Sequence, residues 1–277
     1  MTIIIRQNGT RYDLKEFGIR TKDFVVSSPS PRHTTEEIDG RHGVVDMGTT
    51  YDVRTITCSF RMSAYDLSDY PLMRDEVFAL FQSTEAFYLI DSRIPFKRWF
   101  VKVASSFDPS QAYTFGDFTV QFVSFFPFAE SVGTTQDIQE NGINADDELW
   151  GFGMGLIAED EALKYTHTGT SFRIYNAGNV PIHPFQQDLK ITIKQVRGSA
   201  SYFELRNLTN GTVFRVNEAV SDTQTIVLDG PNITSNGLNF LRKTNKGFIE
   251  LSPGWNDFQI YGASRATIEF DFRFYYL

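Results

Sequence analysis

The chain has 277 residues, which fits one large or two ordinary domains and allows a sizeable buried core. Hydrophobic residues make up 41% of it, which excludes a disordered chain. The 34 acidic residues outnumber the 26 basic ones and give a net charge of -8, so the chain as a whole lacks the cationic surface that nucleic-acid binding needs.

Aromatic residues are the strongest compositional signal. The 26 Phe and 12 Tyr favour β-strands, because aromatic rings pack well on a pleated surface, but such enrichment is also typical of glycan-binding and interface surfaces. The single cysteine, Cys58, excludes an intramolecular disulfide and a cysteine-based metal site, and we expect it to be a small buried residue. The sequence predicts neither a secretory signal nor a membrane span, since no run approaches ~20 apolar residues.

The first part of the chain has the pattern of a β-domain. Residues 3–6 and 21–26 are strand-like, and residues 27–32 (SSPSPR) have the composition of a loop. Residues 51–60 alternate between apolar and polar side chains, which predicts a half-buried strand.

A helix is expected at about residues 68–82. Ser68 or Asp69 can cap it, and Pro71 falls in its first turn, where the missing N–H costs little. The apolar residues that follow at helical spacing are Met73, Val77, Leu80 and Phe81. This is the one helix that the sequence predicts.

Strand patterns then continue to Pro127, where the ladder should stop. We therefore predict an N-terminal domain over residues 1–133. Residues 134–168 are polar, acidic and glycine-bearing, which indicates a linker or extended arm. Trp150 and Phe152 are unusually apolar for a free linker, so we expect them to pack against a domain or a neighbouring subunit.

The remainder, residues 169–277, is predicted to be a second β-domain. Asn210-Gly211 lies between two strand-like runs and is a strong hairpin signal. Residues 268–274 alternate strictly between apolar and charged side chains. Many short strands separated by turn signals are typical of a β-sandwich or jelly roll.

Residue patterns that would indicate catalysis or metal binding are weak. The GFGMG run at 151–155 lacks the strand and helix of a phosphate-binding loop, so we interpret it as structural. The carboxylate runs at 146–148 and 159–161 have the character of solvated charges. None of the four histidines stands at metal-ligand spacing from another: His33, His42, His167 and His183. We therefore expect no enzyme activity, no cofactor and no metal.

Specific sequence motifs in a fixed order say more about the function than composition does. They are GRHGVVDMG, YDVRTITCSF, DYPLMRDEVFALFQ, FYLIDSRIPFKRWFVKV and FFPFAES, followed by FRIYNAGNVPIHP and LSPGWNDFQIYG in the second half. Together they resemble the distal tail (Dit) protein family of siphophages. The resemblance covers most of the chain.

The resemblance implies a fold that is mainly β with one short α-helix. Its N-terminal part would be a β-sandwich or split-barrel-like domain that forms a ring. Its C-terminal part would be a jelly-roll β-sandwich similar to galectins and carbohydrate-binding modules (CBM).

The family also implies a structural virion protein. It would form a homo-hexameric ring that joins the major tail (tube) protein to the tail-associated tip protein and to receptor-binding proteins of the baseplate. DNA would cross the central channel without specific binding. The expected location is the phage tail tip, in the host-attachment apparatus, after assembly in the bacterial cytoplasm and without a membrane partner.

Two sets of residues are candidates for contacts with partners. The interface or structural candidates are Gly40, Arg41, Gly43, Arg54, Asp91, Trp150 and Phe152; for Arg54 and Asp91, ordinary pairing within the domain is an equally open reading. An alternative function is a module that binds host cell-wall glycans. Its candidate glycan-facing aromatics are Tyr165, Tyr175, Tyr202 and Trp255, for which burial in the core is the competing interpretation.

Overall fold

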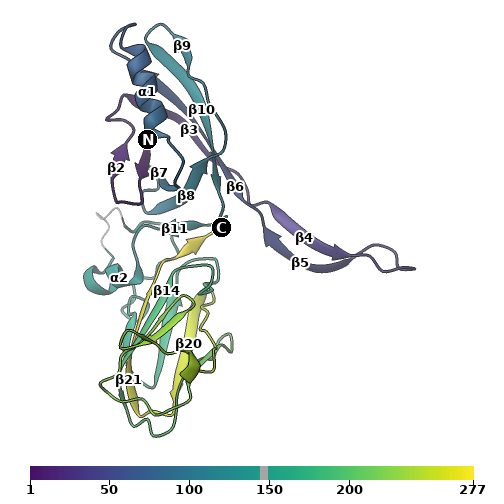
Figure 1. Cartoon of the computed structure of the whole chain (residues 1–277), viewed down its shortest axis with the longest axis vertical. Helices are drawn as coiled ribbons and strands as arrows, with labels where there is room; N and C mark the ends of the chain where they lie inside the picture. The colour runs from purple at the N-terminus through teal and green to yellow at the C-terminus, as the bar shows by residue number, and fades with distance from the viewer. Residues whose placement is uncertain (144–148) are drawn as a thin grey trace. The chain divides into compact units, whose positions relative to one another are not determined.

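The structure is a computed structural model that describes residues 1–143 and 149–277 (Figure 1). The chain divides into two compact units, one of Met1–Ala129 with Leu277 and one of Glu130–Tyr276. Both are built from β-strands, which confirms the mainly-β prediction. The carboxylate run at 146–148, interpreted as solvated charge, lies outside the described residues.

The first unit is an antiparallel sheet with one helix packed on it. The strands of the main path run in the order β2-β1-β7-β8-β10-β6-β3, and β9 pairs with β10. The strands are β1 (Thr2–Ile5), β2 (Arg11–Asp13), β3 (Ile19–Val26), β6 (Arg54–Ser63), β7 (Phe87–Asp91), β8 (Lys97–Val103), β9 (Ser110–Ala112) and β10 (Phe115–Ser124).

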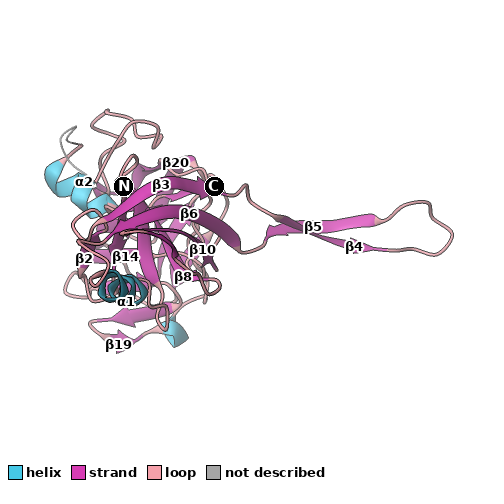
Figure 2. Cartoon of the chain, turned by 90° about the horizontal axis from the view of Figure 1, so that it is seen from above, coloured by secondary structure: helices cyan, strands magenta, loops and turns pink. Residues whose placement is uncertain are grey.

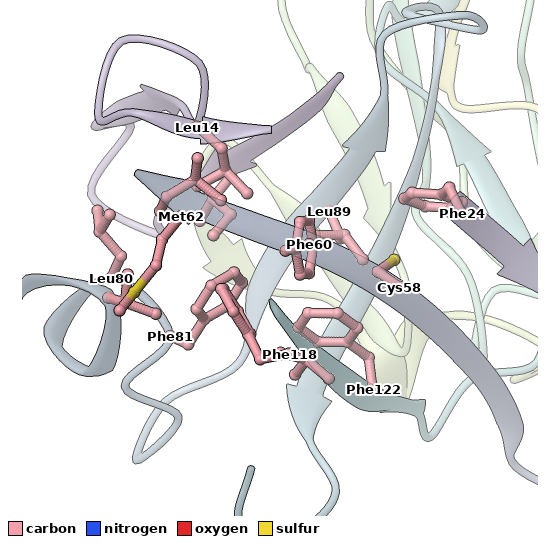
Figure 3. Packing of buried hydrophobic residues seen from close by; sticks show 14 of the residues in the cluster. Leu14, Phe24, Cys58, Phe60, Met62, Leu80, Phe81, Leu89, Phe118 and Phe122 are labelled. Atoms are coloured by element: carbon pink, nitrogen blue, oxygen red, sulfur yellow. The ribbon is translucent and has the colours of Figure 1, made fainter. Parts of the chain in front are cut away.

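The core of this unit is organised by the pairing of β6 with β10. The register places Phe60 opposite Phe118, and the rings of these two residues lie 5.4 Å apart. Phe81, directly after the helix, packs onto the same cluster with its ring 5.4 Å from Phe60 (Figure 3). Cys58 is fully buried between them and the rest of the core, and burial raises the pKa of its thiol, so it is an inert packing residue.

The helix α1 spans Tyr70–Leu80 and buries Met73 and Val77 against the sheet. Pro71 falls in its first turn, as the sequence predicts. The side chain of Asp69 does not cap the helix, because its carboxylate accepts a hydrogen bond from the backbone N–H of Tyr65 at 2.9 Å.

A two-stranded hairpin leaves the first unit between β3 and β6. Its strands β4 (Pro31–Glu36) and β5 (Val45–Tyr51) pair only with each other, within the part of the chain that the structure describes. Figure 2 shows this hairpin extending away from the sheet that carries β3 and β6. We call residues 31–53 the arm.

The second unit is a sandwich of two sheets. One has the order β12-β21-β14-β17-β18-β19, the other β13-β20-β15-β16. Between them the ring of Phe258 stacks on Phe172 at 5.4 Å and packs on Phe270 at 5.1 Å. The strands are β12 (Thr166–Gly169), β13 (Ser171–Asn176), β14 (Leu189–Arg197), β15 (Phe203–Asn207), β16 (Val213–Val216), β17 (Ile226–Asp229), β18 (Asn232–Ser235), β19 (Leu238–Asn239), β20 (Gly254–Tyr261) and β21 (Arg265–Phe272).

Shorter elements complete the second unit. A 3-10 turn, η1 (Leu241–Lys243), follows β19. Near the end of the chain, β22 (Tyr275–Tyr276) pairs with β11 (Ala129–Ser131), so the last strand returns to the start of this unit.

A second helix, α2 (Thr135–Asn141), corrects the prediction of only one. It lies in the segment interpreted as a linker from its polar composition. Its ends carry local signals: the Asp137 carboxylate accepts from the Thr134 N–H at 2.6 Å, and Gly142 ends the helix with φ 69°. The Thr135 hydroxyl donates to the Phe270 carbonyl at 3.0 Å, which fixes the helix to β21.

One buried hydroxyl of the first unit has no hydrogen-bond partner among the described residues. Tyr70 is buried, and its Oη lies so close to Gly116 that a Cβ there would stand 2.5 Å away. Replacing Tyr70→Phe removes an unsatisfied polar atom and should raise the free energy of unfolding by about 1 kcal/mol. Urea unfolding of the two proteins measures this.

The matched change Tyr165→Phe serves as the control. Tyr165 is also buried, and its hydroxyl donates to the Tyr175 carbonyl at 3.0 Å. Its removal should lower stability by about 1 kcal/mol. Equal effects of the two substitutions would contradict the assignment of Tyr70 as unsatisfied.

Candidate assembly surfaces

The arm has no core of its own. Every side chain from Pro31 to Val44 is exposed, and in β5 only Val45 is partly covered. Several of the exposed side chains are apolar, among them Ile38 at 50% and Met47 at 59% exposure. A two-stranded hairpin with no layer against it is marginally stable in water, so this surface is suited to being covered by something else.

The tip of the arm contains three of the predicted interface residues. Gly40 and Gly43 lie in the turn between β4 and β5 with φ values of 81° and 78°, a conformation that strongly favours glycine. Arg41 lies between them and is exposed. The glycines therefore shape the turn, and Arg41 is the residue of the three whose side chain is available to a partner.

Arg54 stands at the root of the arm and braces it. Its Nε donates to the Ser27 carbonyl at 2.9 Å, its Nη1 donates to the Pro127 carbonyl at 3.2 Å, and its guanidinium lies 4.9 Å from the Trp99 ring. The residue is buried, and desolvation lowers its pKa. These contacts join the chain on both sides of the arm to the sheet.

Replacing Arg54→Ala should lower the free energy of unfolding by about 2 kcal/mol, because two charge-assisted hydrogen bonds and a cation–π contact are lost. Arg54→Lys should lose most of the same stability, since an ammonium lacks the guanidinium fork that reaches two carbonyls. Chemical denaturation measures both.

The control for this change is Arg32→Ala on the arm. Arg32 is exposed and makes one long hydrogen bond, 3.4 Å to the Thr50 hydroxyl. Its removal should change stability by less than about 0.5 kcal/mol. If Arg54→Ala is no more destabilising than Arg32→Ala, Arg54 is not a brace.

Asp91, grouped with Arg54 in the sequence analysis, lies at a separate place and has its own partner. Arg93 binds it through Nε and Nη2, the latter at 2.6 Å, and Arg93 also donates to the Phe24 carbonyl at 3.3 Å. The same pairing raises the pKa of Arg93. Both Arg54 and Asp91 thus have their partners within the first unit.

Trp150 and Phe152 are neighbours in sequence but differ in environment. Trp150 is buried in the second unit, with its ring 6.0 Å from Phe274 and pressed so close to Gly133 that a Cβ there would stand 2.5 Å from the ring. Phe152 is 98% exposed and borders a groove of about 310 Å³ with Met154 and Leu156. Trp150 is therefore a core residue of this unit, and only Phe152 offers surface.

Helix α1 also presents apolar surface. Leu72 is 65% exposed, and Phe78 faces a groove of about 490 Å³ together with Phe81, Val103 and Phe107. A second groove, of about 380 Å³, lies on the other side of the helix; its lining includes Tyr12, Phe17, Leu80 and the charged residues Arg6 and Glu76. The first unit thus offers both an uncovered apolar arm and apolar grooves.

The four aromatics considered for glycan stacking do not form one group. Tyr165 is fully buried, so no face of its ring is open to a sugar. Tyr175 and Trp255 pair on neighbouring strands with ring centres 5.0 Å apart, and the Arg173 guanidinium covers the Trp255 ring at 4.3 Å. Tyr202 is covered in the same way by Arg215, also at 4.3 Å.

Sequence reasoning missed two surfaces that the structure reveals. Residues 27–32 were interpreted as a loop and residues 51–60 as a strand, so the hairpin of β4 and β5 was not predicted. Its side chains are exposed on both faces, so they leave no apolar periodicity to detect. In β15, Glu204 and Arg206 alternate with apolar residues, which indicates a row of charged side chains on the outer face. The residue of β16 that lies opposite Glu204, Arg215, cannot be assigned without the strand register.

No described helix is long and apolar enough to cross a membrane. Within residues 1–143 and 149–277, no three His, Cys, Asp or Glu side chains gather to hold a metal ion. One of the four histidines, His167, is buried in the second unit, where its ring stacks on Phe172 at 4.8 Å and its Nε2 lies 2.9 Å from the Lys164 carbonyl. This environment is that of a core histidine.

Burial lowers the pKa of His167, so the folded protein holds it neutral where the unfolded chain would bind a proton. Stability should therefore fall as the pH drops below about 6.5, the ordinary histidine pKa. Replacing His167→Phe keeps the stacked ring and removes the titration. We expect the loss of stability between pH 7.5 and pH 5.5 to be smaller in the variant than in the unmodified protein, measured by urea unfolding; equal losses would show that His167 does not contribute.

Comparison with known proteins identifies the fold. A model of the phage tail protein RIFT-related domain family matches residues 8–124. The crystal structure of the SPP1 Dit (gp 19.1) protein, described as a paradigm of the hub adsorption apparatus in Gram-positive infecting phages, has a TM-score of 0.69. It shares 12% identity with this chain, and the match covers 99% of each chain, so the two share a fold over their whole length.

Two further matches are to the phage P2 baseplate in its activated conformation, with Ca and with Sr. Their TM-scores are 0.40 and 0.41, at 13% identity, and each match covers 98% of this chain and 96% of the other. No curated protein sequence matches the chain.

Proposed function

We propose that this chain, a phage tail protein with the RIFT-related domain and the fold of the siphophage distal tail (Dit) family, is a structural hub of the tail. In this role the first unit self-associates into a ring, a hexamer as the family resemblance implies, around a channel for DNA. The ring joins the tail tube to the tip protein, and the second unit carries other baseplate parts, including receptor-binding proteins. The protein is then located at the tail tip of the virion.

The observation that carries the proposal is the arm. Its apolar side chains are exposed, and among the described residues no third strand pairs with its two strands. Covering this surface with a neighbouring copy removes Ile38, Val44 and Met47 from water, at about 25 cal/mol for each Å² of apolar area. A neighbour that covers the hairpin also protects its open strand edges.

The geometry of such a contact favours a ring. The arm and the apolar grooves beside α1 are different surfaces of one unit, so a contact between them is heterologous and each copy keeps one donor and one acceptor surface. Heterologous contacts close into rings when the rotation between copies is a fraction of a full turn. The exposed side chains of Leu72 and Phe78 on α1 supply apolar area for the acceptor surface.

The alternative function is a glycan-binding module in the second unit. It depends on aromatic rings with open faces, and Trp255 and Tyr202 each have a guanidinium over one face. Stacked Arg and aromatic side chains are more typical of protein interfaces than of sugar sites. The hub function is therefore the better supported of the two, and the proposal includes no catalytic step.

The test is the mass of the purified full-length protein by native mass spectrometry and size-exclusion light scattering. We expect a closed oligomer at high concentration. Replacing Ile38→Ser together with Met47→Ser should shift it to monomers, because both side chains are exposed in the arm and contribute nothing to the core.

The matched control replaces Leu208→Ser and Leu238→Ser in the second unit. These side chains are also exposed, Leu238 at 75%, so the control removes similar apolar area away from the arm. It should retain the oligomer. A protein that stays monomeric at the highest concentration, or that loses its assembly equally in both variants, would contradict ring formation through the arm.

A further inference from the structure

The two solvent-facing sides of the sandwich in the second unit have different chemistry. On β14 and β21 the outer side chains include Lys190, Lys194 and Glu269, and Lys194 pairs with Glu269 at 2.9 Å in the manner of an ordinary solvated surface. The outer face of the sheet β13-β20-β15-β16 is instead rich in aromatic and arginine side chains, which lie beside Asp257 and Gln259 of β20: Arg173, Tyr175, Trp255, Tyr261, Arg206 and Arg215. Tyr, Trp and Arg are the residues most enriched at the energetic centres of protein interfaces.

Two of these arginines share a single carboxylate. The register places Glu204 directly opposite Arg215 on one side and Tyr261 on the other. Arg206 donates to Glu204 Oε1 from Nε at 3.1 Å and from Nη2 at 2.8 Å, and Nη1 of Arg215 lies 3.7 Å from Oε2. Glu204 is buried beneath them.

Aromatic rings hold both guanidinium groups in place. Arg206 lies over the Tyr261 ring at 5.4 Å, and Arg215 lies over the Tyr202 ring at 4.3 Å. Gly262 has its backbone against Tyr202, where a Cβ would stand 2.8 Å from the ring. The two arginines are thus preorganised, which lowers the entropy that a partner must remove on binding.

The cluster has hydrogen-bond donors and positive charge to spare. Two guanidinium groups against one carboxylate leave a net charge of one, and the Nη1 of Arg215 lies 3.7 Å from Glu204, too far for a hydrogen bond. Arg173 on the same face is different, since it pairs one to one with Glu161 through Nε at 3.0 Å and Nη2 at 2.6 Å. A cationic centre on a chain of net charge -8 is a local exception that attracts an acidic group.

We propose that Arg206 and Arg215 bind a carboxylate side chain on an acidic segment of a protein partner. This inference rests on the proposed hub function, in which other tail components dock on the second unit. Glu204 shows that a carboxylate fits against Arg206, and the Nη1 of Arg215, which lies 3.7 Å from Glu204 and so is not held by a hydrogen bond to it, provides the second half of the site. The guanidinium groups cover faces of Tyr202 and Tyr261, which favours a protein segment over a stacked sugar.

The test uses the full-length protein and a fluorescent octaglutamate peptide as the probe. Binding is followed by anisotropy at low salt, and the Nε–Hε signals of Arg206 and Arg215 are followed by NMR. We expect saturable binding that shifts both signals and weakens as salt is added. R206Q/R215Q should weaken binding by about tenfold or more, whereas K190Q/K194Q, which removes two positive charges from the opposite sheet, should leave it within about twofold.

R206Q/R215Q leaves the buried Glu204 carboxylate without a partner and can unfold the domain, so a second variant, E204Q, is tested as well. E204Q is nearly isosteric and removes the internal competitor for the two guanidinium groups. We expect it to strengthen octaglutamate binding by about tenfold. If Glu204 is only part of a structural network, E204Q would weaken binding or leave it unchanged, and the proposal would be wrong.

Two other results would also overturn the proposal. They are equal loss of binding in R206Q/R215Q and K190Q/K194Q, and tighter binding of poly(glycerol phosphate) than of octaglutamate, which would make the occupant a phosphate-bearing polymer. Light scattering on the same samples separates this inference from the hub function. A ring that forms without binding the peptide contradicts only the acidic-segment proposal, and a peptide that binds to a permanent monomer contradicts only the ring.

Discussion

The antiparallel ladder between β6 and β10 is the constraint on which the first unit depends. It pairs the two strands along their whole length, from Arg54 opposite Ser124 to Ser63 opposite Phe115. Its inward face supplies Phe60 and Phe118, onto which α1 and Phe81 pack. Because β6 begins at Arg54, the same ladder fixes the point where the arm leaves the sheet. A register slip by one residue would turn the aromatic core outward and move the arm with it.

Much of this could be predicted from the sequence, because burial on one face leaves a period. The alternation through Ile56, Cys58 and Phe60 marks β6, and the spacing of Met73 and Val77 marks α1. The helix α2 was missed since seven residues are too few for a periodic pattern, and its signals are a Thr134–Asp137 capping pair and Gly142. Composition alone could not distinguish a capped, docked helix from a polar linker.

The candidate surfaces were less predictable, because they depend on pairing between distant segments. Gly40 and Gly43 were candidates for interface or structural roles, yet only the register of β4 with β5 places them at the tip of an arm. Asn210-Gly211 predicts the hairpin that joins β15 to β16, but the turn signal alone does not fix the register that places Glu204 opposite Arg215. For Trp150, an apolar side chain in a polar stretch predicts packing, and the structure buries the residue in the second unit, a location on which the sequence held no information.

The exposure of the arm separates folding from recognition in this chain. The side chains of residues 31–44 are exposed, so substitutions there should be nearly neutral for the stability of the monomer. The arm can therefore change in sequence while the sheet that bears it keeps its fold. In the proposed ring, two related chains present in one cell would then sort into separate assemblies by the fit of their arms, even though their folds superimpose.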